Sequence, residues 1–433
     1  MTAKARMFAF ADSGCSSFLS HIPDPPVCHS LGQAVALFGV EGPIDVIYPA
    51  LLERAARRFV NDFPGRILYA VKANPHPAVL RQLHAAGISD FDVASSAEID
   101  LVRACLPEGR LHFMHPVKSR AAIRHALLNG VRHFAFDCAA ELAKIREEAG
   151  ALALDLTLRI ALPPTGAALE LTGKFGAAEE EAIVLLRQAR PFARRLGIAF
   201  HVGSQCEHPE AFAKAIAHAA GLVHRAGVAI DRLDVGGGFP VPYPDRRPPA
   251  LAHYFRTIRR AMRQCGLKEV ELLCEPGRAL VAEAGSVLLR VDLRKDDALY
   301  LNDGSFGALH DAAALGWRYP ARRIWRAGRG AVTEDPTPLR PFRLFGPTCD
   351  SMDRMDGPFF LPADMAEGDW IEVGHLGAYG AAMRTAFNGF GKGRTVLLRP
   401  RDRQPSAAIA RHSRPRCQTG DARPFDCAAV AAR

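Results

Sequence analysis

The chain has 433 residues, of which 48% are hydrophobic and 23% charged, and its formal net charge is +9. This balance is typical of a globular protein. The chain is longer than a single hydrophobic core usually organises, so we expect two domains. The first ten residues lead into no apolar core of the kind a signal peptide has, and no apolar run approaches the length of a membrane span. We therefore expect a cytoplasmic protein with no membrane partner.

The positive charge comes largely from arginines spread along helices and through the C-terminal tail. No basic block interleaved with aromatic side chains is present, so we expect solvated basic faces and no nucleic-acid partner. The ten cysteines show no C-x-x-C pair and no zinc-ligand spacing. They are expected to be mostly small buried hydrophobic residues, with no metal site.

Residues 1–42 are rich in turn signals and are predicted to be irregular. Strand-like and helix-like segments then alternate. The predicted strands span residues 67–71, 91–93, 111–114, 133–136, 154–160, 198–202, 233–235 and 271–274. The predicted helices between them span residues 78–86, 97–105, 119–128, 140–148, 179–195, 210–226 and 250–265. Eight strands in strict alternation with helices indicate a parallel sheet closed into an α/β (β/α)8 TIM-like barrel, which we assign to residues 43–284.

The pattern changes after residue 284, where strands recur without comparable helices. They are predicted at residues 287–291, 298–301, 340–345, 370–373 and 395–398. Residues 285–400 are therefore assigned to a mostly β C-terminal domain. Residues 401–433 contain Pro, Arg, Ser and Ala without a period and are predicted to be a disordered tail.

Several predicted barrel strands end in polar residues, and the carboxyl ends of barrel strands share one mouth. Lys72 closes the first strand, Asp92 and Arg159 lie in the second and fifth, and His201 is in the sixth. A lysine in that place either extends its ammonium to solvent or takes part in chemistry. The first strand alone leaves both interpretations open.

Glycines follow the last two predicted strands: Gly236, Gly237 and Gly238 after the seventh, and Gly277, followed by Arg278, after the eighth. Backbone N–H groups without Cβ atoms can surround a phosphate, and barrels commonly bind phosphate at these two loops. A lysine, a phosphate cradle and a histidine able to stack predict pyridoxal 5′-phosphate. Glu275 is then placed to keep the pyridine nitrogen protonated.

At this point the motifs resemble a known family, the fold-type III pyridoxal-phosphate decarboxylases, which includes eukaryotic-type ornithine decarboxylase, diaminopimelate decarboxylase and alanine-racemase-like barrels. The matching stretches are YAVKANP (69–75), FDVASSAEI (91–99), HVGSQC (201–206), DVGGGFP (234–240), CEPGRALV (274–281), LNDGSFG (301–307), GPTCDSMD (346–353) and GAYGAAMRTAFNGF (377–390). They follow one another in order from about residue 44 to 400, which makes the resemblance specific.

The resemblance implies a role for each matching position. Lys72 looks like the Schiff-base lysine, His201 like the ring-stacking histidine and Glu275 like the partner of the pyridine nitrogen, with Asp92 and Arg159 as supports. The implied phosphate ligands are Ser204, Gly236, Gly237, Gly238, Gly277, Arg278 and Tyr379. Cys349 resembles the cysteine that returns a proton to Cα and that enters the site from the second subunit of a head-to-tail homodimer.

The implied substrate is a basic L-amino acid, most closely L-ornithine, converted to putrescine for polyamine biosynthesis. The stretch Cys349-Asp350-Ser351-Met352-Asp353 is similar to that of ornithine decarboxylases, and Asp350 would accept hydrogen bonds from the distal ammonium. The Tyr-Asp pair of that group is missing from residues 310–317, where Asp311 or Trp317 could reshape the pocket. L-Lysine, alone or beside ornithine, therefore stays open, because one methylene is worth only about 1–3 kcal/mol.

Three other functions within the same resemblance fit the residues less well. A diaminopimelate decarboxylase would carry Cys-Glu-Ser-Gly in place of the stretch at Cys349. A non-catalytic protein similar to the antizyme inhibitors would have lost cofactor-binding residues, and these are all present. A racemase would lack the Gly-Pro-Thr-Cys-Asp stretch (residues 346–350), which belongs to decarboxylases.

Overall fold

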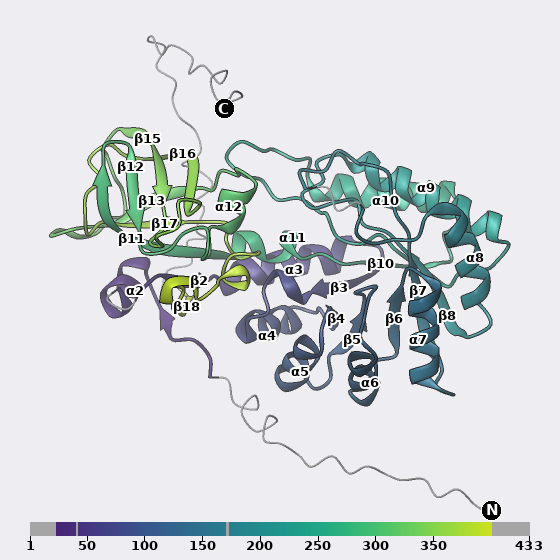
Figure 1. The fold of residues 1–433 in the computed structure, drawn as a ribbon. Coiled ribbons are helices and arrows are strands. Elements are labelled where there is room, and N and C mark those ends of the chain that lie inside the picture. Colours follow the sequence, from purple (N-terminus) through teal and green to yellow (C-terminus); the bar gives the residue numbers. More distant parts are fainter. Residues whose placement is uncertain (1–22, 40–41, 170–172, 401–433) are drawn as a thin grey trace, which may run out of the picture.

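The computed structural model describes residues 23–39, 42–169 and 173–400, and it contains a closed parallel barrel beside a mostly β domain (Figure 1). The predicted tail, residues 401–433, lies outside the described residues, as do residues 1–22. The barrel strands are β3 (Arg66–Ala70), β4 (Asp90–Val93), β5 (Arg110–Phe113), β6 (His133–Phe136), β7 (Leu154–Arg159), β8 (Ala193–Ala199), β9 (Arg232–Asp234) and β10 (Glu271–Cys274). Each strand pairs in parallel with the next and β10 pairs with β3, so the predicted barrel is confirmed.

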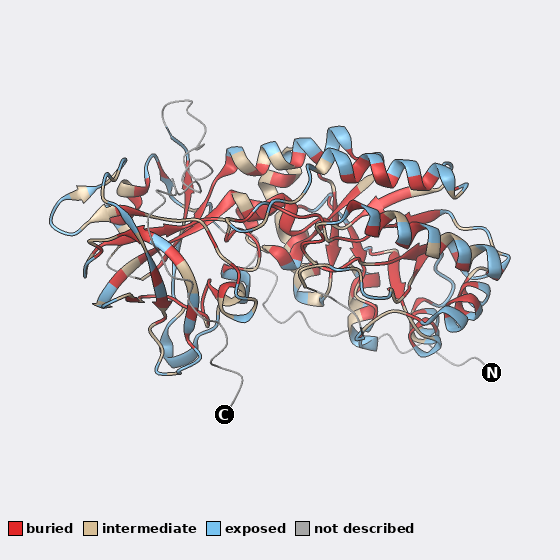
Figure 2. Ribbon diagram, turned by 90° about the horizontal axis from the view of Figure 1, so that it is seen from above, coloured by how far each residue is buried: buried red, intermediate tan, exposed pale blue. Residues whose placement is uncertain are grey.

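Helices cover the outside of the barrel, with their exposed residues facing away from it (Figure 2). They are α3 (Pro49–Asp62), α4 (Pro77–Ala85), α5 (Ser96–Cys105), α6 (Arg120–Leu128), α7 (Ala139–Ala149), α8 (Glu179–Ala189), α9 (Pro209–Ala226) and α10 (Leu251–Gln264). Local chemistry fixes where several begin: Ser95 and Ser119 accept backbone N–H groups at the starts of α5 and α6, and a proline opens α3, α4 and α9. No helix in the described part of the chain is long and apolar enough to cross a membrane.

Two barrel elements differ by more than one residue from their predicted bounds. The predicted helix 179–195 ends at Ala189, and β8 begins at Ala193 rather than at residue 198. Pro191 explains the early end, because proline lacks the N–H that a helix interior needs. The first strand ends at Ala70, so Lys72 lies in the one-turn helix η1 (Val71–Ala73) just beyond it.

The second sheet has ten strands; some of its buried apolar side chains form a small separate core, and the others join the core of the barrel. Its strands are β1 (Val27–Cys28), β2 (Ile44–Ile47), β11 (Gly285–Lys295), β12 (Ala298–Leu301), β13 (Ala321–Arg326), β14 (Gly330–Ala331), β15 (Leu339–Phe345), β16 (Arg354–Pro362), β17 (Trp370–Val373) and β18 (Arg394–Leu398). Its short helices are α2 (Leu31–Phe38), α12 (His310–Ala314), η3 (Ala381–Met383) and η4 (Phe387–Gly389), while α11 (Arg278–Val281) and η2 (Ala282–Ala284) connect it to the barrel. We call this sheet and its short helices the β domain.

The β domain takes in chain that the sequence pattern placed elsewhere. Residues 44–47 were grouped with the barrel, but β2 pairs with β11 and β18 of the β domain. Residues 1–42 were predicted to be irregular, but β1 and α2 form within them, and Ser30 caps α2. These segments are too short and too far from their partners in sequence for local patterns to assign them.

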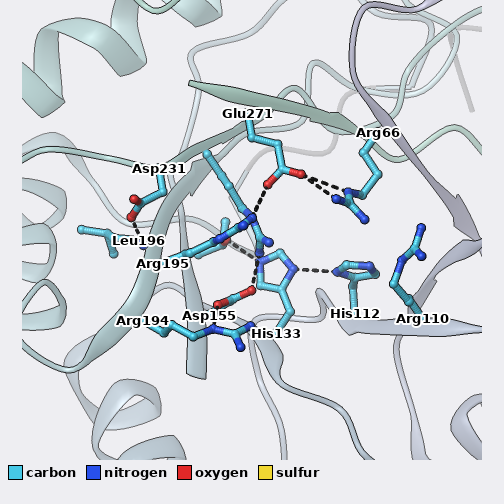
Figure 3. Close-up of polar contacts among 12 residues, drawn as sticks. Arg66, Arg110, His112, His133, Asp155, Arg194, Arg195, Leu196, Asp231 and Glu271 are labelled. Carbon is cyan, nitrogen blue, oxygen red and sulfur yellow. Dashed lines mark hydrogen bonds and ion pairs between the residues drawn. The ribbon is translucent and has the colours of Figure 1, made fainter. Parts of the chain in front are cut away.

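Charged and polar side chains fill the end of the barrel at which the strands begin (Figure 3). Asp90 accepts hydrogen bonds from Arg110 and from His112 Nε2, at 2.6 and 2.9 Å. His112 Nδ1 lies 2.7 Å from His133 Nδ1, and His133 Nε2 lies 2.7 Å from Thr157 Oγ1. A thin apolar layer separates this end from the mouth; it consists of Leu68, Met114, Ala135 and Leu273.

Replacing Asp90 with alanine is expected to destabilise the barrel, because His112 and two arginines would lose their shared carboxylate in a buried site. The expected loss in the free energy of unfolding is about 3 kcal/mol, measured by chemical denaturation at pH 7. Asp297→Ala is the control, since Asp297 forms an exposed pair with Arg343 whose loss should have little effect on stability. Equal losses in the two variants would contradict a structural role for the polar end of the barrel.

Candidate active site

Lys72 lies at the barrel mouth, where the carboxyl ends of β3 and β4 meet. Its Nζ is 3.8 Å from Asp92 Oδ2, and its side chain is 51% exposed while that of Asp92 is 5% exposed. Removal from water lowers the pKa of the Lys72 ammonium, but the charge of Asp92, followed by Tyr379 and Glu275, raises it above its ordinary value. The structure therefore presents a protonated lysine that is open to a ligand and held by a buried carboxylate.

Two more acids, Asp234 and Glu275, lie beside this lysine, and only Glu275 is predicted from the sequence. Asp234 ends β9 and Glu275 follows β10; Gly236 links them, since its N–H donates to Asp234 Oδ1 at 2.8 Å and its carbonyl accepts from Glu275 N at 2.9 Å. Burial raises the pKa of both carboxyls, that of Asp234 to about 7; the charge of Asp92 adds to both shifts, and the charge of Asp234 adds to that of Glu275. Asp234 Oδ2 is buried without a hydrogen-bond donor among the described residues, so the pair holds a proton near neutral pH. The strand-end rule that identified Lys72 would also have found Asp234.

His201 stands over the glycines that follow β9. Its Nδ1 accepts the N–H of Gly203 at 3.0 Å. Burial, followed by the charges of Arg159 and Lys72, lowers the pKa of His201 to about 3. The ring is therefore neutral at pH 7 and suited to face another flat ring. Arg159, at the end of β7, lies over the ring of Phe175 at 5.4 Å.

The glycines after β9 and β10 are required by close backbone approach. A Cβ at Gly237 would lie 2.8 Å from Glu275 O and 2.9 Å from His201 Nε2. A Cβ at Gly238 would lie 2.4 Å from Gly203 O, and its φ of +94° also excludes most side chains. The result is a backbone cradle of the kind that surrounds a phosphate, and pyridoxal phosphate fits the residues present.

The other residues predicted to hold a phosphate lie around the same cradle. Gly277 lacks room for a side chain, because a Cβ there would be 2.9 Å from Ala73 Cβ and 3.5 Å from Tyr379 Oη. Tyr379 itself has a φ of +57°, and its N–H donates to Ala73 O at 2.9 Å, next to Lys72. Arg278 is buried beside it, and Ser204 is half-buried in the loop after β8.

Cys349 and Asp350 are not brought to this mouth. They lie in the loop after β15, where Cys349 N and Sγ lie 3.3 and 3.4 Å from Asn388 Oδ1, and Asp350 accepts the N–H of Met352 at 2.8 Å. Within the described ranges, their recorded polar contacts all stay in the β domain. Cys349 is exposed, as is Met352 beside it.

A family profile described as "Pyridoxal-dependent decarboxylase, pyridoxal binding domain" matches residues 50–282. The chain belongs to this family. It is therefore a decarboxylase that depends on pyridoxal phosphate, as the lysine and the phosphate cradle predicted.

Individual relatives narrow the class of substrate for this decarboxylase. An ornithine decarboxylase of Panagrellus redivivus is 33% identical over 356 residues, 76% of this chain and 79% of the relative. The structure of a Vibrio vulnificus lysine/ornithine decarboxylase with cadaverine is similar with a TM-score of 0.71 at 31% identity, covering 84% of this chain and 95% of the other. An arginine decarboxylase of Paramecium bursaria Chlorella virus, bound to agmatine, gives a TM-score of 0.74 at 26% identity, with coverage of 85% and 99%. By their names, these three relatives act on basic amino acids.

The raised pKa of Asp234 predicts a pH-dependent effect of Asp234→Asn on the cofactor-free protein. A carboxyl whose pKa rises on folding costs stability above its folded pKa and costs none below its unfolded pKa, near 4. The variant should therefore be more stable than the parent at pH 8, on the order of 2 kcal/mol, with the gain vanishing towards pH 4. Thermal unfolding at several pH values measures this, and a gain independent of pH would contradict the shared proton.

Asp297→Asn is the control for the pH series. Hydrogen bonds from Arg343 lower the pKa of the exposed Asp297, which is the opposite direction. Its replacement should give no gain in stability at pH 8.

Proposed function

We propose that this decarboxylase converts L-ornithine to putrescine and carbon dioxide, and that L-lysine is its alternative or second substrate. The observation that carries the proposal is Asp350 next to Cys349. The N–H of Met352 holds one oxygen of the Asp350 carboxylate at 2.8 Å, which fixes an anion where the distal ammonium of a basic substrate could be bound. Similarity to decarboxylases whose names include ornithine and lysine supports the same pair of substrates.

The proposal that L-lysine is also a substrate is supported by a contact of Asp311. Asp311 is the acidic residue within residues 310–317, and it pairs with Arg278 at 2.9 Å. Because Asp311 is paired with Arg278, only Asp350 of these two acids would be left to bind the distal ammonium of the substrate. A single anion selects a substrate with a positively charged side chain, but it discriminates weakly between side chains that differ in length by one methylene.

The residues at the barrel mouth are proposed to hold the cofactor. Lys72 would bind its aldehyde, His201 would lie against its ring, and Glu275 would face its pyridine nitrogen. The phosphate would be held by Ser204, Gly236, Gly237, Gly238, Gly277, Arg278 and Tyr379. When bound, pyridoxal phosphate supplies an electron sink for the pair left at Cα when the Cα–carboxylate bond breaks.

The protein's own groups manage the charges around that reaction. The raised pKa of Glu275 means that its carboxyl can hold a proton near neutral pH; passed to the ring nitrogen, that proton would make the ring a stronger electron sink and leave a Glu275 carboxylate to stabilise the positive charge. The nearby Asp92 carboxylate favours the charged form of the free Lys72 ammonium. Arg159 adds a fixed positive charge near both, as its effect on the pKa of Lys72 indicates. Cys349 is proposed to deliver the proton that replaces the carboxylate on Cα.

Because Cys349 lies away from the mouth of its own barrel, we propose a head-to-tail homodimer in which Cys349 and Asp350 enter the partner's mouth. The surface around this loop supports that arrangement. Met352 is 74% exposed, and Met383, Phe387 and Phe390 are also exposed in the segment that holds Asn388. Large apolar side chains gathered on one surface are typical of a protein interface.

The substrate proposal is tested by comparing kcat/KM for L-ornithine, L-lysine, L-arginine and meso-diaminopimelate in the parent enzyme and in Asp350→Asn. The variant should lose about 10–100-fold in kcat/KM for ornithine, mainly through KM, because the distal ammonium loses its charged partner. Asp356→Asn, an exposed change in the neighbouring strand β16, is the control and should change nothing. A parent enzyme that prefers meso-diaminopimelate, or a variant with unchanged KM, would refute the proposal.

The homodimer is tested by mixing two inactive variants, Lys72→Ala and Cys349→Ala. A mixed dimer has one site that contains both intact residues, so equal mixing should restore about a quarter of the parent activity. Two different affinity tags, captured in turn, show that mixed dimers have formed. Mixed dimers without activity would mean that each site is built from one subunit.

A further inference from the structure

Arg278 is held in a fixed position behind the phosphate cradle. Its side chain is 5% exposed; Nη1 donates to Tyr243 Oη at 2.9 Å and Nη2 to Asp311 Oδ2 at 2.9 Å. Its Nε is buried and has no hydrogen-bond partner among the described residues. Unpartnered buried Nε atoms also occur at Arg246 and Arg384, so the free Nε of Arg278 does not by itself identify a ligand site. It leaves Arg278 with a donor that is available to a ligand.

Two aromatic rings fix the plane of the same guanidinium. Trp317 lies 4.6 Å from it and Tyr379 lies 4.9 Å from it, measured to the ring centroids. Tyr243 packs against Trp317 with centroids 5.3 Å apart, so the hydroxyl that receives Nη1 belongs to the same wall. Every group around Arg278 restricts its orientation.

The groups that hold Arg278 come from both parts of the molecule. Arg278 begins α11 directly after the barrel, and Tyr243 lies in the loop after β9. Asp311 lies on α12, and Trp317 and Tyr379 follow in the β domain. Arg278, which directly follows Gly277, is thus oriented by a carboxylate of the β domain.

From its place in the sequence, Asp311 is predicted to be a residue that could reshape the substrate end of the pocket. The structure places it elsewhere, because its carboxylate is 14% exposed and is paired with Arg278. A buried carboxylate that meets an arginine fixes the guanidinium through a charge-assisted hydrogen bond and through planar geometry. Its effect on the reaction then runs through Arg278.

We propose that Asp311 is a positioning residue for the cofactor phosphate: it orients Arg278 so that the free Nε faces the phosphate of pyridoxal phosphate. This inference rests on the proposed role of Arg278 as a phosphate ligand. On this proposal, the segment 310–317, which lacks the Tyr-Asp pair of ornithine decarboxylases, contributes to cofactor binding rather than to substrate choice. The β domain thereby contributes to cofactor affinity from within the same chain.

The test compares pyridoxal 5′-phosphate with pyridoxal, which lacks the phosphate, as ligands of the full-length protein after its cofactor has been removed. Asp311→Asn keeps the shape of the side chain but removes its charge. It should weaken pyridoxal phosphate about tenfold and leave pyridoxal unchanged. Asp311→Glu restores the charge and should recover most of the affinity. Asp297→Asn, which breaks the exposed pair with Arg343, is the matched control and should change neither ligand.

Arg278→Ala separates a failure of this inference from a failure of the proposed function. It should weaken pyridoxal phosphate selectively, and adding Asp311→Asn to it should cause no further loss, because Asp311 acts through Arg278. If Arg278→Ala affects both ligands equally, Arg278 is not a phosphate ligand and both statements fail. If Arg278→Ala is selective but Asp311→Asn leaves affinity unchanged, raises it or weakens pyridoxal as much, the inference alone is overturned. If Asp311→Asn fails to fold, Asp311→Glu is used instead. The inference is then overturned if Asp311→Glu loses the parent's preference for pyridoxal 5′-phosphate over pyridoxal.

Discussion

Closure of the parallel barrel is the constraint on which the site depends, because it brings the carboxyl ends of all eight strands to one mouth. Side chains that are far apart in sequence, such as Lys72 and Glu275, thereby act on one another's charge. The opposite end of the barrel carries its own network of charges, and between the two lies only a thin apolar layer. The interior can be this polar because charges at each end are paired, hydrogen-bonded or share a proton.

That constraint also explains how much of the site could be predicted from the sequence. Short apolar runs that alternate with amphipathic helices identify the barrel, and polar residues at the ends of those runs identify the mouth. Lys72 and Asp92 were found in this way, and the structure places them 3.8 Å apart. Asp234 obeys the same rule, but it lies two residues before Gly236, in a stretch whose glycines indicated a backbone site instead. Its raised pKa depends on burial, which the sequence does not show.

Features that depend on contacts between distant segments could not be predicted. The strand at residues 44–47 has no local mark that assigns it to β11, which it meets some 240 residues later. The partner of Asp311 was equally hidden, because the sequence shows an acid near a proposed substrate pocket and the structure shows an ion pair with Arg278. The misplaced boundary before β8 differs in kind, since Pro191 was a local signal that should have ended the helix earlier.

On the proposed assignment, the two parts of the molecule contribute different groups to one reaction. The barrel would supply groups that suit any amino-acid decarboxylation: a lysine, acids that hold protons and glycine loops for a phosphate. The β domain supplies Asp311 and Trp317 behind Arg278, and it bears the exposed loop of Cys349 and Asp350. In this arrangement the loop at Asp350 can change with the substrate while the charges around Lys72 stay the same, which fits relatives named for ornithine, lysine and arginine.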